Sequence, residues 1–201
     1  MRGPNTHKTG DFGQNGGVSR AIALAETALI PRKNTAMMSK KRMEPYDAAW
    51  EQRYQEIHEE LRGAIGDVAL AIEHIGNTSF STLITTTVLD VMIGVADINV
   101  ADTCADRMIP LGYEALDEGG GPDQRFLKRV YPDGLKVRAH IVERSGEFWG
   151  EQLLFRNFLR ENRETAVEYA HLTKQLDDKD EFLTKKEEFI ANVVRQARAV
   201  D

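Results

Sequence analysis

The sequence has little cysteine, no long apolar run and none of several well-known catalytic motifs. The single cysteine, Cys104, excludes an intramolecular disulfide and fits a reducing compartment, so we expect a cytoplasmic protein. No segment approaches the roughly 18 consecutive apolar residues of a membrane-spanning helix, and we expect no membrane partner. A P-loop, a dinucleotide fingerprint, a Ser-His-Asp order and a Cys/His zinc pattern are all missing. Any site must therefore be assembled from scattered residues.

Basic residues are scarce in most of the chain and concentrate at its beginning. Residues 1–42 hold eight Lys and Arg against two Asp and Glu, a net charge of +6. Because the whole chain has a net charge of −6, residues 43–201 carry −12. An acidic body repels phosphate backbones, so we expect no general binding of nucleic acid.

Residues 1–42 are rich in Gly, Asn, Thr and Ser, a composition that cannot offset the entropy of ordering and predicts disorder. Two other interpretations stay open. The segment is basic and poor in acids, as transit peptides are, or it is a gene-model extension before a true start at Met38 or Met43. We favour disorder or an extension over targeting, because no cleavage pattern is evident. Residues 43–201 are long enough for one domain with a real core.

The body alternates helical and strand patterns. Apolar residues from Trp50 to Ile65 recur at steps of three and four, which predicts an amphipathic helix ended by Gly66. Strands are expected at 68–75 and 88–95, the second being a near-continuous apolar run of the kind buried on both faces. The further expected elements are a helix over 102–108, a hairpin of 125–130 and 135–143, and helices that begin near 149, 165 and 178. This order predicts an α+β fold with C-terminal helices.

Several charged side chains occur where the surrounding pattern is apolar or aromatic. Lys186 falls near the centre of the apolar stripe of the final helix. A lysine there ordinarily extends to water from the edge of the stripe, and the alternative is that it meets a phosphate or carboxylate in a cleft. Arg156 lies between Phe155 and Phe158 and must either find an anion or reach the surface.

The returning strand of the hairpin carries a histidine that could bind a metal. Period-two alternation places Arg138 and His140 on one face, and Ile141 and Glu143 on the other. A lone strand histidine is more often a hydrogen-bonded structural residue than a ligand. The metal ligands that we consider are Asp90, His140 and Glu143, with Glu73 as a further carboxylate.

Short motifs in residues 43 to about 198 follow one another in a specific order and spacing. They are Tyr46-x-x-x-Trp50, Glu73-His74-Ile75-Gly76, Val88-Leu89-Asp90-Val91, Leu111-Gly112-Tyr113-Glu114, Arg125-Phe126, His140-Ile141-Val142-Glu143, Trp149-x-x-x-Leu153, Leu154-Phe155-Arg156-Asn157-Phe158-Leu159-Arg160 and Lys186-x-x-Phe189-Ile190. Together they resemble the GrpB family, a branch of the nucleotidyltransferase superfamily.

The resemblance implies a nucleotidyltransferase-like mixed sheet flanked by helices, and an activity that is poorly defined. In that superfamily a small-residue turn lets backbone N–H groups approach a triphosphate, and acids on the next strand hold Mg²⁺. Carried over, Gly76, Asn77 and Thr78 would bind substrate, and Asp90 would be catalytic and hold Mg²⁺. The charge of the phosphates would be offset by Arg125, Arg156 and Lys186. Related domains fused to dephospho-coenzyme A kinase suggest a link to nucleotide or coenzyme A metabolism.

The chain departs from the family pattern at the site itself. The family turn usually reads Gly-Ser-Thr-Ser-Val-Pro-Gly-Leu and continues to Lys-Pro, whereas here the chain runs from Gly76 through Asn77 to Leu83 and then to Thr86-Thr87. The missing lysine removes a charge that would pair with phosphate. Met92 takes the place of the second acid, and Arg138 replaces the first histidine of a His-x-His pair.

Two functions follow as hypotheses. The first is a Mg²⁺-dependent transferase that moves a nucleotidyl group from a nucleoside triphosphate to a small-molecule acceptor, with Asp90 at the metal. The second is a non-catalytic nucleotide- or ligand-binding accessory protein that keeps the fold. A carboxylate of Glu73 or Glu143 beside Asp90 would favour the first, and its absence would favour the second. The sequence leaves open whether the chain forms a homodimer.

Overall fold

The computed structural model describes residues 44–80, 83–84, 88–116, 122–175 and 179–200. The elements in these ranges are β1 (Glu44–Pro45), α2 (Ala49–Ile65), β2 (Ala71–Ile75), the 3-10 turn η1 (Asn77–Ser79), β3 (Leu83–Ile84), β4 (Val88–Val95), α3 (Ile98–Met108), η2 (Ile109–Leu111), β5 (Glu114–Ala115), β6 (Gln124–Val130), β7 (Lys136–Glu143), α4 (Glu147–Glu161), α5 (Arg163–Gln175) and α6 (Lys179–Val200). The predictions for residues 1–42 fall outside the described residues.

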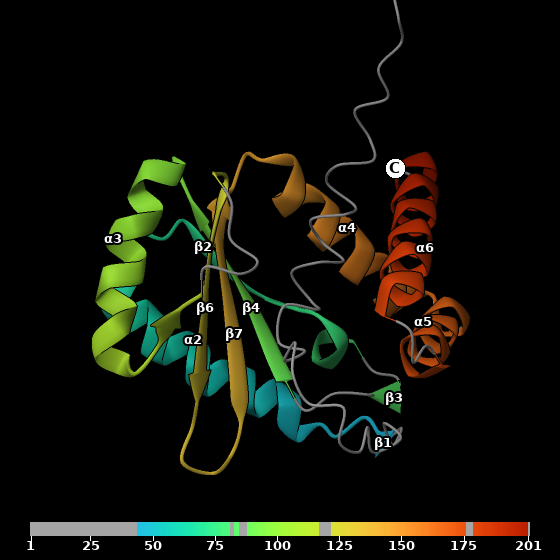
Figure 1. Cartoon of the computed structure of the whole chain (residues 1–201), viewed down its shortest axis with the longest axis horizontal. Coiled ribbons are helices and arrows are strands. Elements are labelled where there is room, and N and C mark those ends of the chain that lie inside the picture. Colours follow the sequence, from blue (N-terminus) through green and yellow to red (C-terminus); the bar gives the residue numbers. More distant parts are fainter. Residues whose placement is uncertain (1–43, 81–82, 85–87, 117–121, 176–178, 201) are drawn as a thin grey trace, which may run out of the picture.

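A five-stranded mixed sheet forms the centre of the fold, with the strand order β2-β4-β7-β6-β5. Strands β4 and β7 pair in parallel, and the other neighbours pair antiparallel. Helices α2 and α3 lie on one side of the sheet, and α4, α5 and α6 lie on the other (Figure 1). This arrangement confirms the predicted α+β fold with a mixed sheet flanked by helices.

The main apolar core lies between the sheet and helices α2 and α3. Successive side chains of a strand point to opposite faces, so alternate residues of β4 and β7 enter this core. They are Leu89, Val91, Ile93, Val95, Val137, Ala139 and Ile141, and each is fully buried. Leu61 and Ile65 of α2 close the core from the helix side. Burial of each large aliphatic side chain contributes about 1.5–3 kcal/mol, so this face supplies much of the stability.

A second apolar cluster holds the C-terminal helices together. Phe155 and Leu159 of α4 pack against Tyr169 of α5 and against Ile190 and Val193 of α6. The aromatic rings of Phe155 and Tyr169 meet edge to face, with their centroids 5.1 Å apart. Helix α4 thereby joins the sheet to α5 and α6.

Two elements begin three or more residues away from the position that the sequence predicts. The first strand starts at Ala71 rather than at residue 68, because the amides of Val68 and Ala69 donate back to the Ile65 carbonyl and continue the helical turn. Helix α3 starts at Ile98 rather than at 102, because the Asp97 side chain accepts from the Asn99 amide at 2.7 Å and caps the helix. The predicted strand over 88–95 is confirmed in full.

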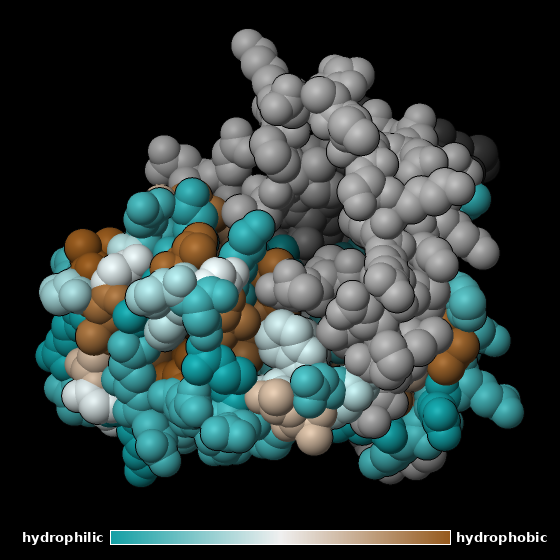
Figure 2. All heavy atoms as spheres, turned by 90° about the horizontal axis from the view of Figure 1, so that it is seen from below, coloured by the Kyte–Doolittle hydropathy of each residue, from teal (hydrophilic) through white to brown (hydrophobic). Residues whose placement is uncertain are grey.

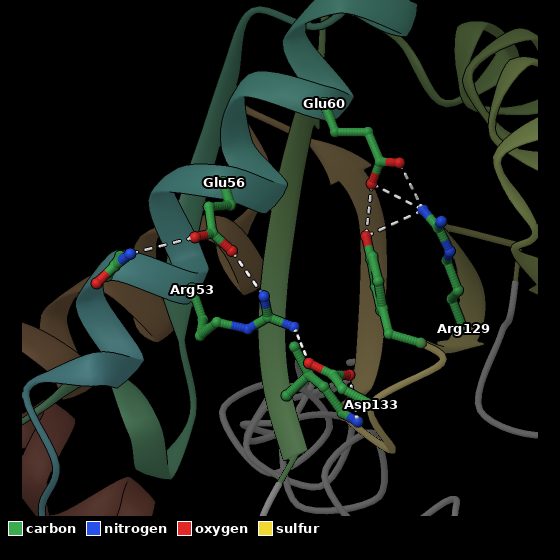
Figure 3. Close-up of polar contacts among 8 residues, drawn as sticks. Arg53, Glu56, Glu60, Arg129 and Asp133 are labelled. Carbon is green, nitrogen blue, oxygen red and sulfur yellow. Dashed lines mark hydrogen bonds and ion pairs between the residues drawn. The ribbon is translucent and has the colours of Figure 1, made fainter.

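A polar network links α2 to the β6–β7 hairpin (Figure 3). Glu60 of α2 accepts hydrogen bonds from Arg129 at 2.7 and 2.8 Å, and also from the Tyr131 hydroxyl. Arg53, two helical turns before Glu60 in α2, pairs with Asp133 in the hairpin turn and with Glu56 at 2.7 Å. These contacts fix the end of the hairpin on α2, on the side of the sheet away from Asp90.

The surface seen in Figure 2 is mostly hydrophilic over the described residues, with apolar side chains visible between polar ones. The exposed large apolar residues are Leu70, Ile109 and Val130. Within the described ranges, every helix is too short or too polar to cross a lipid bilayer.

Candidate functional site

Asp90 lies at the centre of the sheet and pairs with an arginine. In the strand register it stands opposite Arg138 on β7 and Ile75 on β2. Arg138 donates through Nε to Oδ1 of Asp90 and through Nη2 to Oδ2, the latter at 2.7 Å. Burial raises the pKa of Asp90, but the charge of Arg138 and the nearby His140 ring outweigh it and hold the pKa at about 2. Both carboxylate oxygens therefore belong to a buried ion pair.

The glycine turn packs directly on this carboxylate. Gly76 has φ +72° and ψ −172°, a conformation that residues other than glycine rarely adopt. A Cβ atom at this position would overlap with Oδ2 of Asp90 and lie 3.0 Å from its Cγ. The glycine predicted from sequence is therefore required here, both by backbone conformation and by its close approach to Asp90.

His140 lies beside the ion pair on the same face of β7. Its Nδ1 is 2.9 Å from Nε2 of Gln124 on the neighbouring strand β6, and its ring lies 4.8 Å from the ring of Phe126 between centroids. Its Nε2 is 3.8 Å from Oδ1 of Asp90, which is beyond hydrogen-bond distance. The structure thus brings His140 and Asp90 together, as the sequence predicts.

Two arginines of α4 donate hydrogen bonds to β2 and to the turn that follows it. Arg156 donates to the Glu73 carboxylate at 2.7 Å and to the His74 carbonyl at 2.9 Å. Arg160 donates to the Ser79 carbonyl at 2.8 Å. Of the two alternatives for Arg156, an anion or the surface, the structure shows the anion, which Glu73 supplies. These two arginines therefore position the turn that covers Asp90.

The side chains of Thr78 and His74 form a hydrogen bond with each other. Oγ1 of Thr78 is 2.9 Å from Nε2 of His74, and the histidine ring stacks on Tyr54 with centroids 4.6 Å apart. Burial lowers the pKa of His74 to about 4, so the ring is neutral at neutral pH. Thr78, which is fully buried, and Asn77 form the first residues of η1 directly after Gly76. Gly76 lies against Asp90, and Asn77 and Thr78 follow in η1, which contacts β4; the binding of substrate by these three residues stays a prediction.

Two of the predicted site residues lie on the opposite face of the sheet. Glu143 accepts a hydrogen bond from the Ile98 amide at 3.0 Å and so caps the start of α3. Arg125 forms an ion pair with Asp102 of α3 at 2.6 Å. Strand alternation points both side chains away from Asp90. Their assignment to the site, Glu143 as a metal ligand and Arg125 as a phosphate contact, is therefore corrected.

Lys186 is buried, with 3% of the residue exposed. The expectation that its ammonium extends to water from the edge of the stripe is wrong. It lies one, two and three helical turns before Ile190, Val193 and Ala197, which are all buried, and α6 packs along α4. Lys186 is therefore buried because it lies on the same side of α6 as these apolar residues.

The residues around Asp90 do not fit a magnesium ion. Mg²⁺ requires near-octahedral oxygen ligands, and a two-metal site needs shared carboxylates. Both oxygens of Asp90 already accept hydrogen bonds from Arg138, the next residue on its face is the fully buried Met92, and Glu73 is paired with Arg156. No group of three His, Cys, Asp or Glu within the described ranges is placed to hold a metal ion.

Three further residues of the site are not predicted from sequence: Gln124, Gln152 and Arg160. The antiparallel pairing of β6 with β7 brings Gln124 to His140, and no sequence pattern indicates this contact. Gln152 is a polar residue on the buried stripe of α4, four positions after Phe148, and this interruption of the stripe is the signal that could have identified it.

Comparison with known proteins adds the relatives of this chain. The model of the GrpB family, described as GrpB protein, matches residues 40–196. A UPF0157 protein of Deinococcus radiodurans is 29% identical over 157 residues, covering 76% of this chain and 80% of that protein. The crystal structure of the conserved protein GrpB from Enterococcus faecalis matches with a TM-score of 0.66 and 29% identity, over 78% of this chain and 96% of that one.

A dephospho-CoA kinase of Mycobacterium bovis is 32% identical over 79 residues, which are 38% of this chain and 19% of the kinase. The similarity to that enzyme is thus confined to a part of each protein. The family model, by contrast, spans most of the chain and includes every residue of the site from Glu73 to Lys186. The chain belongs to the GrpB family.

Proposed function

We propose that this chain is a non-catalytic protein that binds a nucleotide-sized small molecule without a divalent metal. The observation that carries the proposal is the buried ion pair between Asp90 and Arg138. A guanidinium is planar and permanently charged, and it fits the two oxygens of one carboxylate. Arg138 therefore supplies, within the protein, the positive charge that a metal ion would supply to Asp90.

The other carboxylates support the same proposal. Glu143 caps α3 on the far face, and Glu73 is held by Arg156 at 2.7 Å. Release of Asp90 for metal binding would break the ion pair that it forms with Arg138, a residue that is only 5% exposed. Breaking a buried ion pair costs several kcal/mol, which opposes a metal-dependent transfer at this position.

Retained polar groups on the same face support ligand binding. His140, Gln124 and Gln152 are all buried, although apolar side chains at these positions would stabilise the fold more simply. The partial similarity to dephospho-CoA kinases makes dephospho-CoA a reasonable ligand to test beside nucleotides. A link to coenzyme A metabolism stays part of this proposal.

The test is isothermal titration of the full chain with ATP, GTP, UTP and dephospho-CoA, each in Mg²⁺ and again in EDTA. We expect at least one ligand to bind with an affinity that changes less than twofold between the two conditions. The variant D90N/R138Q, which removes both charges of the pair together, should keep this binding. The matched control is Arg107→Gln, which removes the charge of an exposed α3 residue that pairs with Asp67.

The outcomes separate the two functional hypotheses. Binding that requires Mg²⁺ and disappears in D90N/R138Q would overturn the proposal and support a transferase with a metal at Asp90. Absence of binding for all four ligands in both conditions would overturn it as well, and would leave the fold without a nucleotide-sized ligand.

A further inference from the structure

Two deeply buried nitrogen atoms, one on the Asp90 face of β7 and one on α4, have no hydrogen-bond partner. They are Nε2 of His140 and Nε2 of Gln152, in residues that are 1% and 2% exposed. A buried polar group that is left unpaired costs about 1–3 kcal/mol, so native proteins seldom keep two of them without a reason. A ligand that accepts hydrogen bonds at both atoms would be such a reason.

The hydrogen bond from Gln124 determines what His140 can offer. The amide nitrogen of Gln124 faces Nδ1 of His140 at 2.9 Å. Because an amide nitrogen only donates, Nδ1 accepts, and the neutral imidazole carries its proton on Nε2. The rings of Phe126 and Phe148 lie 4.8 and 6.3 Å from the imidazole between centroids and hold its plane. His140 therefore presents a fixed N–H donor.

Gln152 occupies a matching position on α4. It lies one helical turn after Phe148, which packs near His140, and one turn before Arg156, which bonds the His74 carbonyl. Helix α4 lies beside the sheet in Figure 1 and contacts both β2 and β7. Gln152 is 2% exposed and shares the helical stripe of Phe148 and Arg156, which places it on the sheet-facing side of α4, and its Nε2 can only donate.

The charges nearby decide which acceptor suits these donors. Asp90 and Arg138 neutralise each other, and Oδ1 of Asp90 is only 3.8 Å from Nε2 of His140. An oxyanion placed at Nε2 would be repelled by this carboxylate at close range. A neutral carbonyl oxygen would meet no such repulsion and would suit a site flanked by phenylalanine rings.

We infer that His140 and Gln152 form a subsite that hydrogen-bonds the carbonyl edge of a neutral planar group, and that this group is a nucleobase. The inference rests on the proposed function, because it names the part of the nucleotide-sized ligand that these residues recognise. Gln124 is the positioning residue, since its hydrogen bond sets the tautomer of His140.

The test combines ring-nitrogen NMR with two variants. In the full chain labelled with ¹⁵N-histidine, the signal of His140 among the five histidines is assigned by its loss in His140→Phe. The probes are uridine, which has carbonyls and no phosphate, and inorganic phosphate. We expect uridine to shift the Nε2 signal of His140, and phosphate to leave it unchanged.

Gln152→Leu distinguishes a ligand donor from a structural residue. Because Gln152 Nε2 is unpaired in the fold, replacement by leucine should leave the melting temperature unchanged or raise it, while uridine affinity falls about tenfold. Gln55→Leu, at an exposed glutamine of α2, should change neither quantity.

Each remaining outcome overturns a defined statement. A shift of His140 by phosphate but not by uridine, or unchanged uridine affinity in Gln152→Leu, contradicts the subsite and leaves metal-independent nucleotide binding intact. A lower melting temperature in Gln152→Leu contradicts the assignment of Gln152 as a ligand donor. A uridine response at His140 together with Mg²⁺-dependent nucleotide binding supports the subsite and overturns the proposed function alone.

Discussion

The two faces of strands β4 and β7 differ although the same backbone builds both. Toward α2 and α3 the two strands present Leu89, Val91, Ile93, Val137 and Ile141, which are all fully buried in the main apolar core. Toward α4 they present Asp90, Met92, Arg138 and His140, which are just as deeply buried and are mostly polar. Burial of the side chains is similar on the two faces, but its effect on stability differs between them.

On the first face burial itself stabilises the fold, and many sequences with similar volumes would do as well. On the second face each buried polar group must be paired, or its desolvation destabilises the fold. The Asp90–Arg138 pair satisfies two such groups, whereas Nε2 of His140 and Nε2 of Gln152 stay unpaired. We therefore expect the second face to tolerate substitution poorly where charges are paired, and well where donors lack partners.

The largest effect is expected for Arg138→Ala. It leaves the Asp90 carboxylate buried without its partner, which should lower the free energy of unfolding by about 3–5 kcal/mol. Arg107→Ala, which breaks an ion pair with exposed partners, should change it by less than about 1 kcal/mol. Urea unfolding measures both variants. Equal losses in the two would remove the distinction between the buried pair and a surface pair.

The next effect is expected for Gly76→Ala, because it adds a Cβ both at a positive φ and against Asp90. We expect a loss of more than about 2 kcal/mol in the free energy of unfolding. Gly134→Ala is the matched control, since Gly134 has φ +87° but no atom within 4 Å of the added Cβ. The difference between the two losses in free energy of unfolding measures the contact with Asp90. Equal losses would mean that the added Cβ does not clash with Asp90.

A pH dependence of similar or smaller size follows from Asp90. Its pKa is about 2 in the folded protein and 3.8 ordinarily, so the ionised form stabilises the fold. The stabilisation is fully present above about pH 4 and is lost as the pH falls toward 2, an effect of about 2 kcal/mol.

The measurement compares urea unfolding of the wild-type chain and D90N/R138Q between pH 5 and pH 2.5. Other carboxylates titrate in both proteins, so the steeper decline of the wild type reports Asp90. Parallel declines would show that the ion pair does not hold the pKa of Asp90 down.

The smallest effect is expected on the apolar face. Ile93→Val removes one methylene group from the core and should lower the free energy of unfolding by about 1 kcal/mol. The loss should be the same at pH 4 and pH 7, and ligand binding should not change, because Ile93 lies in the apolar core on the face away from Asp90. A change in ligand affinity in Ile93→Val would show that packing on the apolar face affects the binding site, and would contradict the independence of the two faces.

The sequence predicts the elements well where one periodic signal dominates. The apolar run from Val88 to Val95 predicts β4 without error, and the stripe from Trp50 to Ile65 predicts α2. Element ends are less well predicted where a carbonyl or a side chain outside the pattern decides them. The Ile65 carbonyl delays β2, and the Asp97 cap advances α3.

The sequence alone determined the family, through its ordered motifs, and the α+β class and the face shared by Arg138 and His140, because periodicity is a local property. Only the tertiary structure decided the partners. The parallel pairing of β4 with β7 places Arg138 on Asp90, and α3 takes up Glu143 and Arg125. The packing of α4 places Arg156 on Glu73. Charged residues far apart in sequence find their partners through strand order and helix packing, which no local pattern records.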